Sequence, residues 1–327
     1  MKPFHSLFVL LMFAVATRAD KPAKTPDPLA KTRQAVAKSL PFLEKQGVAW
    51  MTERKCIACH HGAFLLWSHN EAKVRGIAVD EKKLAGFTRQ ALDLVAKRLK
   101  TFAESKNGGV ESAHMLLSQA YAPRHDEKTV TEFATLGKVL LASQKPDGFW
   151  KYEGQTLKRP DAEGDSATTL WAVFALAGVE KSPEQAKVRD AALAWLGKGK
   201  PGDGTEALAL RVILEHERGA KAAKETLLAD LLSRQNKDGS WSWSKGWKSD
   251  THATGQVLYA LARIGLADTP AAGRARDYLL AGQRDDGSWF SPTHKPEAKD
   301  NPIALYWGSA WASIGLARTL PEVKVEK

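Results

Sequence analysis

The feature that most constrains this chain is a seven-residue pattern, Gln-x-x-Asp-Gly-x-Trp, that occurs three times. Its copies occupy residues 144–150, 235–241 and 283–289. The first interval, 91 residues, is about twice the second, 48 residues. A degenerate copy is therefore expected between the first two, and residues 194–204 fit that place. Repeats at this spacing are typical of folds in which one supersecondary unit stacks on its own copies.

The sequence around each copy predicts a helical hairpin. A helix with one charged face precedes the Gln, and the Gly supplies the backbone freedom that a sharp reversal needs. A second, more apolar helix follows. Two of these second helices open at Asp165 and Asp250, and an Asp followed by Ser or Thr suits the N-cap position. Because these helices are apolar nearly all round, we expect them to be buried.

The same plan extends along the chain and predicts six hairpins. Two early hairpins lack the signature and comprise residues 34–51 with 62–75 and residues 84–103 with 110–122. The other four lie near residues 130–178, 185–219, 223–267 and 271–319. We therefore predict an all-α fold, an α/α toroid with an inner ring of buried helices inside an outer ring. An open solenoid is the alternative, but its ends would need polar caps, and the last inner helix, 303–316, is not polar.

The repeated turns resemble those of the terpenoid cyclase and protein prenyltransferase superfamily, and squalene–hopene cyclases are the most similar through their Gln/Trp repeats. The resemblance covers residues 30–320 by architecture and residues 144–289 by motif. It implies a toroid whose central cavity binds a polyprene, which an Asp-rich motif at an inner-helix start protonates. That motif, Asp-x-Asp-Asp-Thr-Ala, would place its proton-donating Asp at Gly164, and only Asp165 matches its end. The zinc pattern of the prenyltransferases is not matched.

A second motif, Cys-x-x-Cys-His, contains the only two cysteines of the chain, Cys56 and Cys59, followed by His60. This is the attachment signature of c-type haem. Two thiols one helical turn apart reach the two vinyl groups on one porphyrin edge, and the His ligates the iron. His114 or Met115, which open the next inner helix, are candidates for the second iron ligand. A haem would imply a redox role and a redox partner.

Three other interpretations of the cysteine pair remain open. The two thiols could form a local disulfide in an oxidising compartment. They could bind zinc together with His60 or His61 and a distant ligand. The pattern could also be fortuitous. Haem c is the cofactor that the sequence favours, with zinc as the alternative.

The starts of the inner helices should gather at one mouth of the toroid. Carboxylates and imidazoles that converge on a concave site are candidate catalytic groups, and we select Asp165, Asp250 and His252. The other residues expected there are His60, His61, Glu111, His114, Glu206, Tyr306 and Trp307. Helix capping is the competing interpretation of both aspartates.

The tryptophans fall into two groups. Trp150, Trp241 and Trp289 end the repeated pattern, and we expect them to serve packing. Trp243 and Trp247 lie beyond the turn and are candidates for the rim of a sugar- or lipid-binding site.

The N-terminus predicts export. Residues 1–19 have a positive start, an apolar run and a small-residue cleavage site, as in a signal peptide. Residues 20–30 are expected to form a linker, residues 31–320 the toroid and residues 321–327 a tail. No segment is long and apolar enough to span a membrane.

The charge of the chain gives little information about partners. The net charge falls from +11 to +9 when the signal peptide, with Lys2 and Arg18, is removed. The basic residues are dispersed along amphipathic helices, which favours a solvated surface. Nucleic acid is therefore not an expected partner, and we expect a monomer.

Three functional hypotheses follow. The first is an exported toroid that binds an apolar or carbohydrate ligand in its central cavity and carries haem c or a metal at residues 56–60. The second is an isomerase or lyase that acts on a terpenoid or polysaccharide through inner-helix carboxylates. The third is a non-catalytic scaffold that binds a partner protein.

Overall fold

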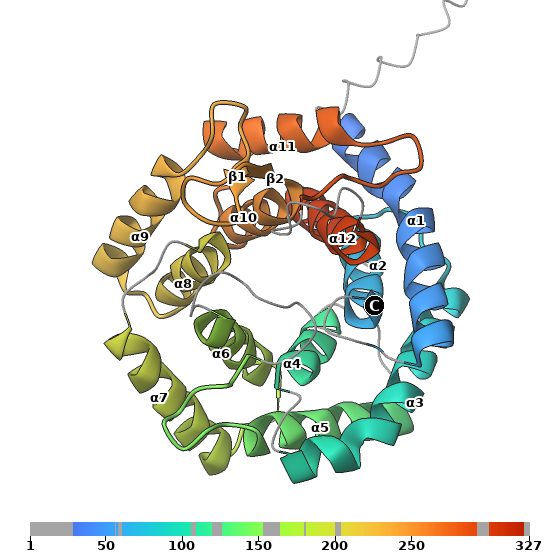
Figure 1. The fold of residues 1–327 in the computed structure, drawn as a ribbon, viewed down its shortest axis with the longest axis vertical. Helices are drawn as coiled ribbons and strands as arrows, with labels where there is room; N and C mark the ends of the chain where they lie inside the picture. The colour runs from blue at the N-terminus through green and yellow to red at the C-terminus, as the bar shows by residue number, and fades with distance from the viewer. Residues whose placement is uncertain are drawn as a thin grey trace, which may run out of the picture.

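The computed structural model describes residues 29–55, 57, 61–105, 109–119, 126–152, 164–179, 181–199, 204–292 and 301–323, and for residues 100–105 the backbone alone. Within these residues, twelve α-helices alternate between an outer and an inner ring (Figure 1). The expected signal peptide and most of the linker lie outside the described residues.

The two rings confirm the predicted all-α toroid of six hairpins. The outer ring consists of α1 (Ala30–Arg54), α3 (Glu81–Ser105), α5 (Glu127–Ala142), α7 (Pro183–Lys198), α9 (Lys221–Ser233) and α11 (Pro270–Gly282). The inner ring consists of α2 (Ala63–Val74), α4 (Gly109–Ser118), α6 (Gly164–Leu176), α8 (Thr205–Glu217), α10 (Thr251–Arg263) and α12 (Pro302–Arg318). The ring is closed because α12 packs against both α1 and α2.

The Gln of each signature links its own turn to the next outer helix. In each copy the side-chain amide donates to the carbonyl oxygen of the Gly in the same turn. It also donates to a carbonyl oxygen of the following outer helix: Gln144 to Val188 (2.7 Å), Gln235 to Ala271 (2.9 Å) and Gln283 to Ala35 (2.8 Å). Since Ala35 belongs to α1, the last signature joins the end of the ring to its beginning.

The Trp of each signature links the two helices of its hairpin. All three indoles are buried, and each Nε1 donates to a carbonyl oxygen of the preceding outer helix. Each backbone N–H of these tryptophans donates to a hydroxyl of the following inner helix: Trp150 to Thr169, Trp241 to Thr254 and Trp289 to Ser309. The three tryptophans therefore pack between helices, as the sequence predicts.

The signature Gly is required for two reasons. Gly148 and Gly239 have positive φ angles of 97° and 89°. Residues with a Cβ atom rarely adopt this backbone conformation, whereas glycine adopts it readily. A Cβ atom at either position would lie 2.5 Å from a carbonyl oxygen of the next outer helix, that of Ala191 or Arg274. The turn thus allows two neighbouring hairpins to approach each other closely.

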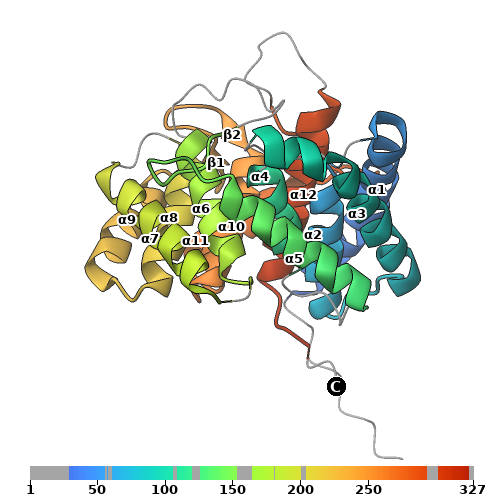
Figure 2. The ribbon, with the colours of Figure 1, turned by 90° about the horizontal axis from the view of Figure 1, so that it is seen from below.

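One small sheet interrupts the helical pattern, which the sequence analysis did not anticipate. Strands β1 (Trp241–Ser242) and β2 (Ser249–Asp250) pair antiparallel. The reversal between them uses Gly246 at a φ of 80°. Figure 2 shows the two strands at one face of the toroid, whereas α12 leads to the opposite face.

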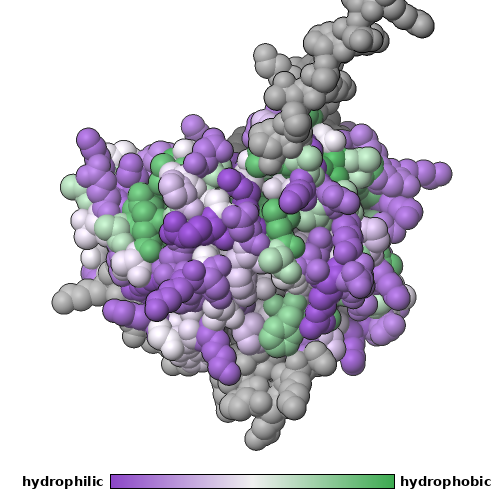
Figure 3. Space-filling model, turned by 90° about the horizontal axis from the view of Figure 1, so that it is seen from above, coloured by the Kyte–Doolittle hydropathy of each residue, from purple (hydrophilic) through white to green (hydrophobic). Residues whose placement is uncertain are grey.

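The outer surface is mostly hydrophilic on the side shown in Figure 3, with small separate hydrophobic areas. Among the described residues, no helix is both long enough and apolar enough to cross a membrane.

Candidate functional site

The inner helices all begin at one face of the toroid, which we call the N-terminal mouth. The inner helices α6, α10 and α12 direct residues toward the axis of the ring, where they contact one another. On α10 these are His252, Tyr259 and Arg263, and on α12 they include Trp307 and Trp311, because His252 contacts Trp307 and Tyr259 contacts Trp311. These residues form successive layers from the N-terminal mouth to the other end.

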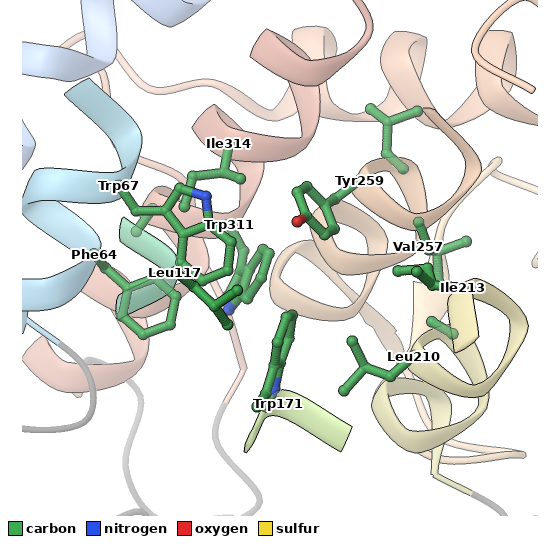
Figure 4. Close-up of a cluster of buried hydrophobic side chains, with 14 of the residues drawn as sticks. Phe64, Trp67, Leu117, Trp171, Leu210, Ile213, Val257, Tyr259, Trp311 and Ile314 are labelled. Carbon is green, nitrogen blue, oxygen red and sulfur yellow. The ribbon is translucent and has the colours of Figure 1, made fainter. Parts of the chain in front are cut away.

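The middle of the ring is filled by aromatic side chains, which we call the aromatic centre. Its members come from four inner helices and are Phe64, Trp67, Trp171, Tyr259 and Trp311 (Figure 4). The ring centroid of Trp67 lies 5.7 Å from that of Trp171 and 5.8 Å from that of Tyr259. The centroids of Trp171 and Trp311 are 5.6 Å apart. Because these rings meet across the axis, the toroid is not an open tube at this level.

Charged side chains occupy the end opposite the N-terminal mouth. Glu71 is 0% exposed, and its carboxylate lies 3.2 Å from the guanidinium of Arg318. Burial raises the pKa of Glu71, and the positive charge of Arg318 opposes that effect. Arg263 contacts Glu217 at 2.6 Å and donates to the Tyr259 hydroxyl at 3.1 Å. Interhelical ion pairs therefore lie beneath the aromatic centre.

Two buried imidazoles form part of the wall at the N-terminal mouth. His252 lies between Trp243 and Trp307, with centroid distances of 4.7 and 4.5 Å. His114 contacts Phe64 at 5.0 Å and Trp171 at 5.7 Å. Indole, phenyl and imidazole rings consequently pack together at this face.

Asp250 is the most deeply buried of the candidate catalytic carboxyls. It caps α10, since its Oδ1 accepts from the His252 backbone N–H at 2.9 Å, and it also accepts from the Ser291 hydroxyl at 2.7 Å. Its exposed fraction is 2%, and burial raises its pKa to about 6. The capping prediction is confirmed for Asp250. Burial additionally gives this carboxyl a pKa suited to proton transfer near neutral pH.

Asp165 has a different environment. It lies in the first turn of α6, is half-buried, and accepts from the backbone N–H of Tyr152 at 2.6 Å. Asp250 and His252 are adjacent at the start of α10, but α8 stands between α6 and α10 in the ring. The structure thus brings Asp250 and His252 together and places Asp165 on another wall.

Two further carboxylates at the N-terminal mouth have partners. Glu206 accepts from the Trp171 indole at 2.8 Å, which connects α8 to the aromatic centre. Glu111 pairs with Arg98 at 3.2 Å. At the rim, Trp247 is 41% exposed, whereas Trp243 is packed beside His252.

The Cys-x-x-Cys-His residues Cys56, Cys59 and His60 lie outside the described residues. Ile57, between the two cysteines, is buried in a hydrophobic cluster that also contains Met115. Within the described part of the chain, no group of three or more His, Cys, Asp or Glu side chains is arranged to hold a metal ion.

The residue after the motif, His61, is held in an aromatic stack. Its ring lies between Trp50, at a centroid distance of 4.2 Å, and Tyr306, at 4.0 Å. The Tyr306 hydroxyl donates to the His61 carbonyl oxygen at 3.1 Å, and burial raises the pKa of this phenol. Tyr306 therefore contacts the residue that follows the motif, whereas its neighbour Trp307 contacts His252 at the N-terminal mouth.

The two candidate second ligands face different surroundings. Met115 lies in the same hydrophobic cluster as Ile57. His114, one residue earlier, points toward the aromatic centre.

Sequence reasoning missed the aromatic centre and one polar side chain beside it, Gln256. The helical spacing of the sequence contained the information needed to place these side chains on one helix face. Starting from His252, positions four and seven residues later are Gln256 and Tyr259, and Trp311 follows Trp307 by four.

Comparisons with known proteins give distant similarities. No family model matches the sequence. The chain is 32% identical over 202 residues to a drimenyl diphosphate synthase of Streptantibioticus cattleyicolor, which covers 55% of this chain and 36% of that protein. It is 29% identical over 204 residues to a drimenyl diphosphate synthase of Streptomyces showdoensis, with 56% of this chain and 36% of that protein covered. The chain thus spans about a third of the length of these relatives.

A solved structure of a UGL variant with dGlcA-Glc-Rha-Glc has a TM-score of 0.56 and 17% sequence identity, and the match covers 80% of this chain and 86% of that one. This likeness shows the α/α-toroid fold, and the similarity to the synthases relates the sequence to terpenoid-cyclase-like proteins.

Proposed function

We propose that this protein binds an apolar, isoprenoid-like ligand at the N-terminal mouth, against the aromatic centre. The observation that carries the proposal is the set of buried aromatic rings that four inner helices direct toward one axis. Apolar pockets with a few placed polar groups are the usual form of small-molecule sites. The similarity to drimenyl diphosphate synthases supports a terpenoid-type ligand.

A carbohydrate is the competing ligand class, because the structure of the UGL variant contains the carbohydrate dGlcA-Glc-Rha-Glc. Sugar recognition needs many hydrogen-bonding groups directed at the ligand. Here Asp250 is engaged by Ser291, and Glu206 by Trp171. The aromatic walls with internally bonded carboxylates favour an apolar ligand.

Binding of farnesane, a saturated fifteen-carbon isoprenoid delivered from cyclodextrin, tests this proposal through tryptophan fluorescence. We expect saturable quenching, and Trp307→Ala should weaken the affinity about tenfold by removing buried contact area. Trp195→Ala is the matched control, because Trp195 lies on the outer helix α7 and stacks on Phe149. Quenching that does not saturate, or an equal loss in both variants, contradicts the proposal. Saturable binding of a neutral tetrasaccharide in its place favours the carbohydrate alternative.

A second candidate function is acid–base catalysis, and the buried Asp250 is the observation that favours it. A carboxyl with a pKa of about 6 can donate or accept a proton near neutral pH. The raised pKa makes Asp250 a weak acid for alkene protonation, so this function concerns isomerisation or elimination beside a substrate oxygen. His252 would orient the substrate, and Asp165 would be dispensable. Any turnover should be abolished by Asp250→Asn and retained by Asp165→Asn, and the reverse result would reject Asp250 as the acid.

We also propose that the protein is exported and that it carries haem c at Cys56 and Cys59, with His60 as the iron ligand. One residue inside the motif and one directly after it fit an anchored attachment site, since Ile57 is buried and His61 is stacked. Met115 shares the cluster of Ile57 and is the better candidate for a second ligand. The haem would supply one-electron chemistry and require a redox partner.

Expression with periplasmic haem maturation, followed by the absorption spectrum of the denatured, pyridine-treated chain, tests this attachment. We expect a covalent haem band that Cys56→Ala/Cys59→Ala abolishes, and an N-terminus at Asp20 after export. A chain without the band rejects haem c, and retained zinc by elemental analysis would then identify the alternative metal.

A further inference from the structure

Two buried hydrogen-bond donors on α10 and α12 have no acceptor among the described residues. Trp311 is 0% exposed and Gln256 is 4% exposed. Within the described part of the chain, neither Trp311 Nε1 nor Gln256 Nε2 has a hydrogen-bond partner. Leaving a buried donor unpaired costs about 1–3 kcal/mol, and most buried polar groups in folded proteins are paired. Two such donors on inner helices that pack together, α10 and α12, therefore require an explanation.

The helical register places both donors toward the axis of the ring. Gln256 follows His252 by four residues and precedes Tyr259 by three. The rings of His252 and Tyr259 lie 6.3 and 5.7 Å from that of Trp311. Residues at this spacing share one helix face, so Gln256 lies on the face that meets Trp311. The donors are one helical turn deeper than His252 and Trp307, at the inner end of the N-terminal mouth.

The charges near the donors determine what kind of acceptor fits them. Among the described residues, the acidic groups at the N-terminal mouth are Asp165, Glu206, Asp250 and Glu111, and Arg98 is engaged by Glu111. Carboxylates repel a diphosphate, and two neutral N–H donors cannot neutralise one. An uncharged oxygen needs only donors of this kind.

We propose that the ligand is an apolar molecule with one uncharged oxygen, a hydroxyl, carbonyl or ether, at the end that enters first. This oxygen accepts hydrogen bonds from Trp311 Nε1 and Gln256 Nε2, and the hydrocarbon part lies against the rings of the N-terminal mouth. The inference rests on the proposed apolar site and specifies its ligand class. It separates this chain from a protein whose ligand carries a diphosphate.

Three probes of equal carbon skeleton test the inference: farnesol, farnesane and farnesyl diphosphate. In tryptophan-fluorescence titrations with the wild-type chain, farnesol should bind at least tenfold more tightly than either of the others. Gln256→Met keeps the side-chain length and removes the amide, so farnesol affinity should fall about fivefold while farnesane affinity stays unchanged. Trp311→Phe, which keeps a ring and removes the N–H, should act in the same direction.

Gln90→Met on the outer helix α3 is the matched control and should leave all three affinities unchanged, because Gln90 bonds only to the exposed Thr52 hydroxyl among the described contacts. Equal binding of farnesol and farnesane would leave the apolar site intact and overturn the inference. Tightest binding of the diphosphate would also overturn it. If no probe binds, the proposed function and the inference both fail. The wild-type comparison decides the question even if one variant does not fold.

Discussion

At the scale of single residues, burial changes the pKa of a side chain and with it the proton transfers that the side chain can perform. Asp250 and Asp165 both stand at inner-helix starts, and the sequence makes them look alike. Asp250 is deeply buried, and burial raises its pKa, whereas Asp165 is only half-buried. Neither its depth nor its hydrogen bond from Ser291, 41 residues away, follows from local sequence.

The raised pKa of Asp250 predicts a pH-dependent stability. The folded-state pKa of about 6 exceeds the ordinary value of 3.8, so this carboxyl favours the folded state below about pH 4. That stabilisation is lost as the pH rises through 6, by about 3 kcal/mol in total. Asp250→Asn keeps an acceptor oxygen for Ser291 and avoids burying a charge.

The melting temperature of Asp250→Asn relative to wild type should therefore rise between pH 4 and pH 8, as measured by circular dichroism. Asp230→Asn provides the opposite case, because its hydrogen bond to Arg234 lowers the pKa of Asp230. That variant should lose stability relative to wild type as the pH rises to about 4, and the difference should stay nearly constant above that pH. A pH-independent difference for Asp250→Asn would contradict the account.

At the scale of elements, the signature turn carries most of the connections between hairpins. Its Gln, Gly and Trp contact three different helices, and the sequence repeat alone predicted the turn and its glycine. The short β1–β2 pair was not predictable, since it follows only one copy and consists of two residues per strand. Helix ends were expected within a few residues of those observed, because propensity and capping are local properties.

Gly239→Ala should destabilise the protein by about 2–4 kcal/mol, since the added methyl meets the Arg274 carbonyl oxygen and the φ angle is positive. Gly246→Ala isolates the backbone contribution, because Gly246 has a φ of 80° and open space around it. We expect that control to cost about 1 kcal/mol. Urea unfolding measures both values, and equal losses would show that contact with α11 is unimportant.

At the scale of the whole molecule, the closed ring distinguishes a toroid from a solenoid. The apolar last inner helix predicted closure, and the packing of α12 on α1 and α2, with the bond from Gln283 to Ala35, provides it. The aromatic centre could not be predicted in the same way. It depends on which faces of α2, α6, α10 and α12 meet across the axis, and helical spacing alone does not specify distances between helices that are far apart in sequence.

Closure predicts that the last signature matters as much as an internal one. Gln283→Leu and Gln144→Leu each remove two hydrogen bonds to backbone carbonyls, and each should cost about 1–3 kcal/mol. Denaturant unfolding should show similar losses and a single transition for both variants. A negligible loss for Gln283→Leu alone would indicate that the ends of the ring separate easily.

The central claim is that an apolar ligand lies inside the inner ring, and photo-crosslinking tests it most directly. A farnesyl ether with a diazirine on its hydrocarbon chain would be irradiated with the protein, and the labelled peptides identified by mass spectrometry. The account predicts labels on α10 and α12, around His252 and Trp307, that excess farnesol removes. Labels confined to the outer helices, or labels that farnesol does not compete away, would contradict it.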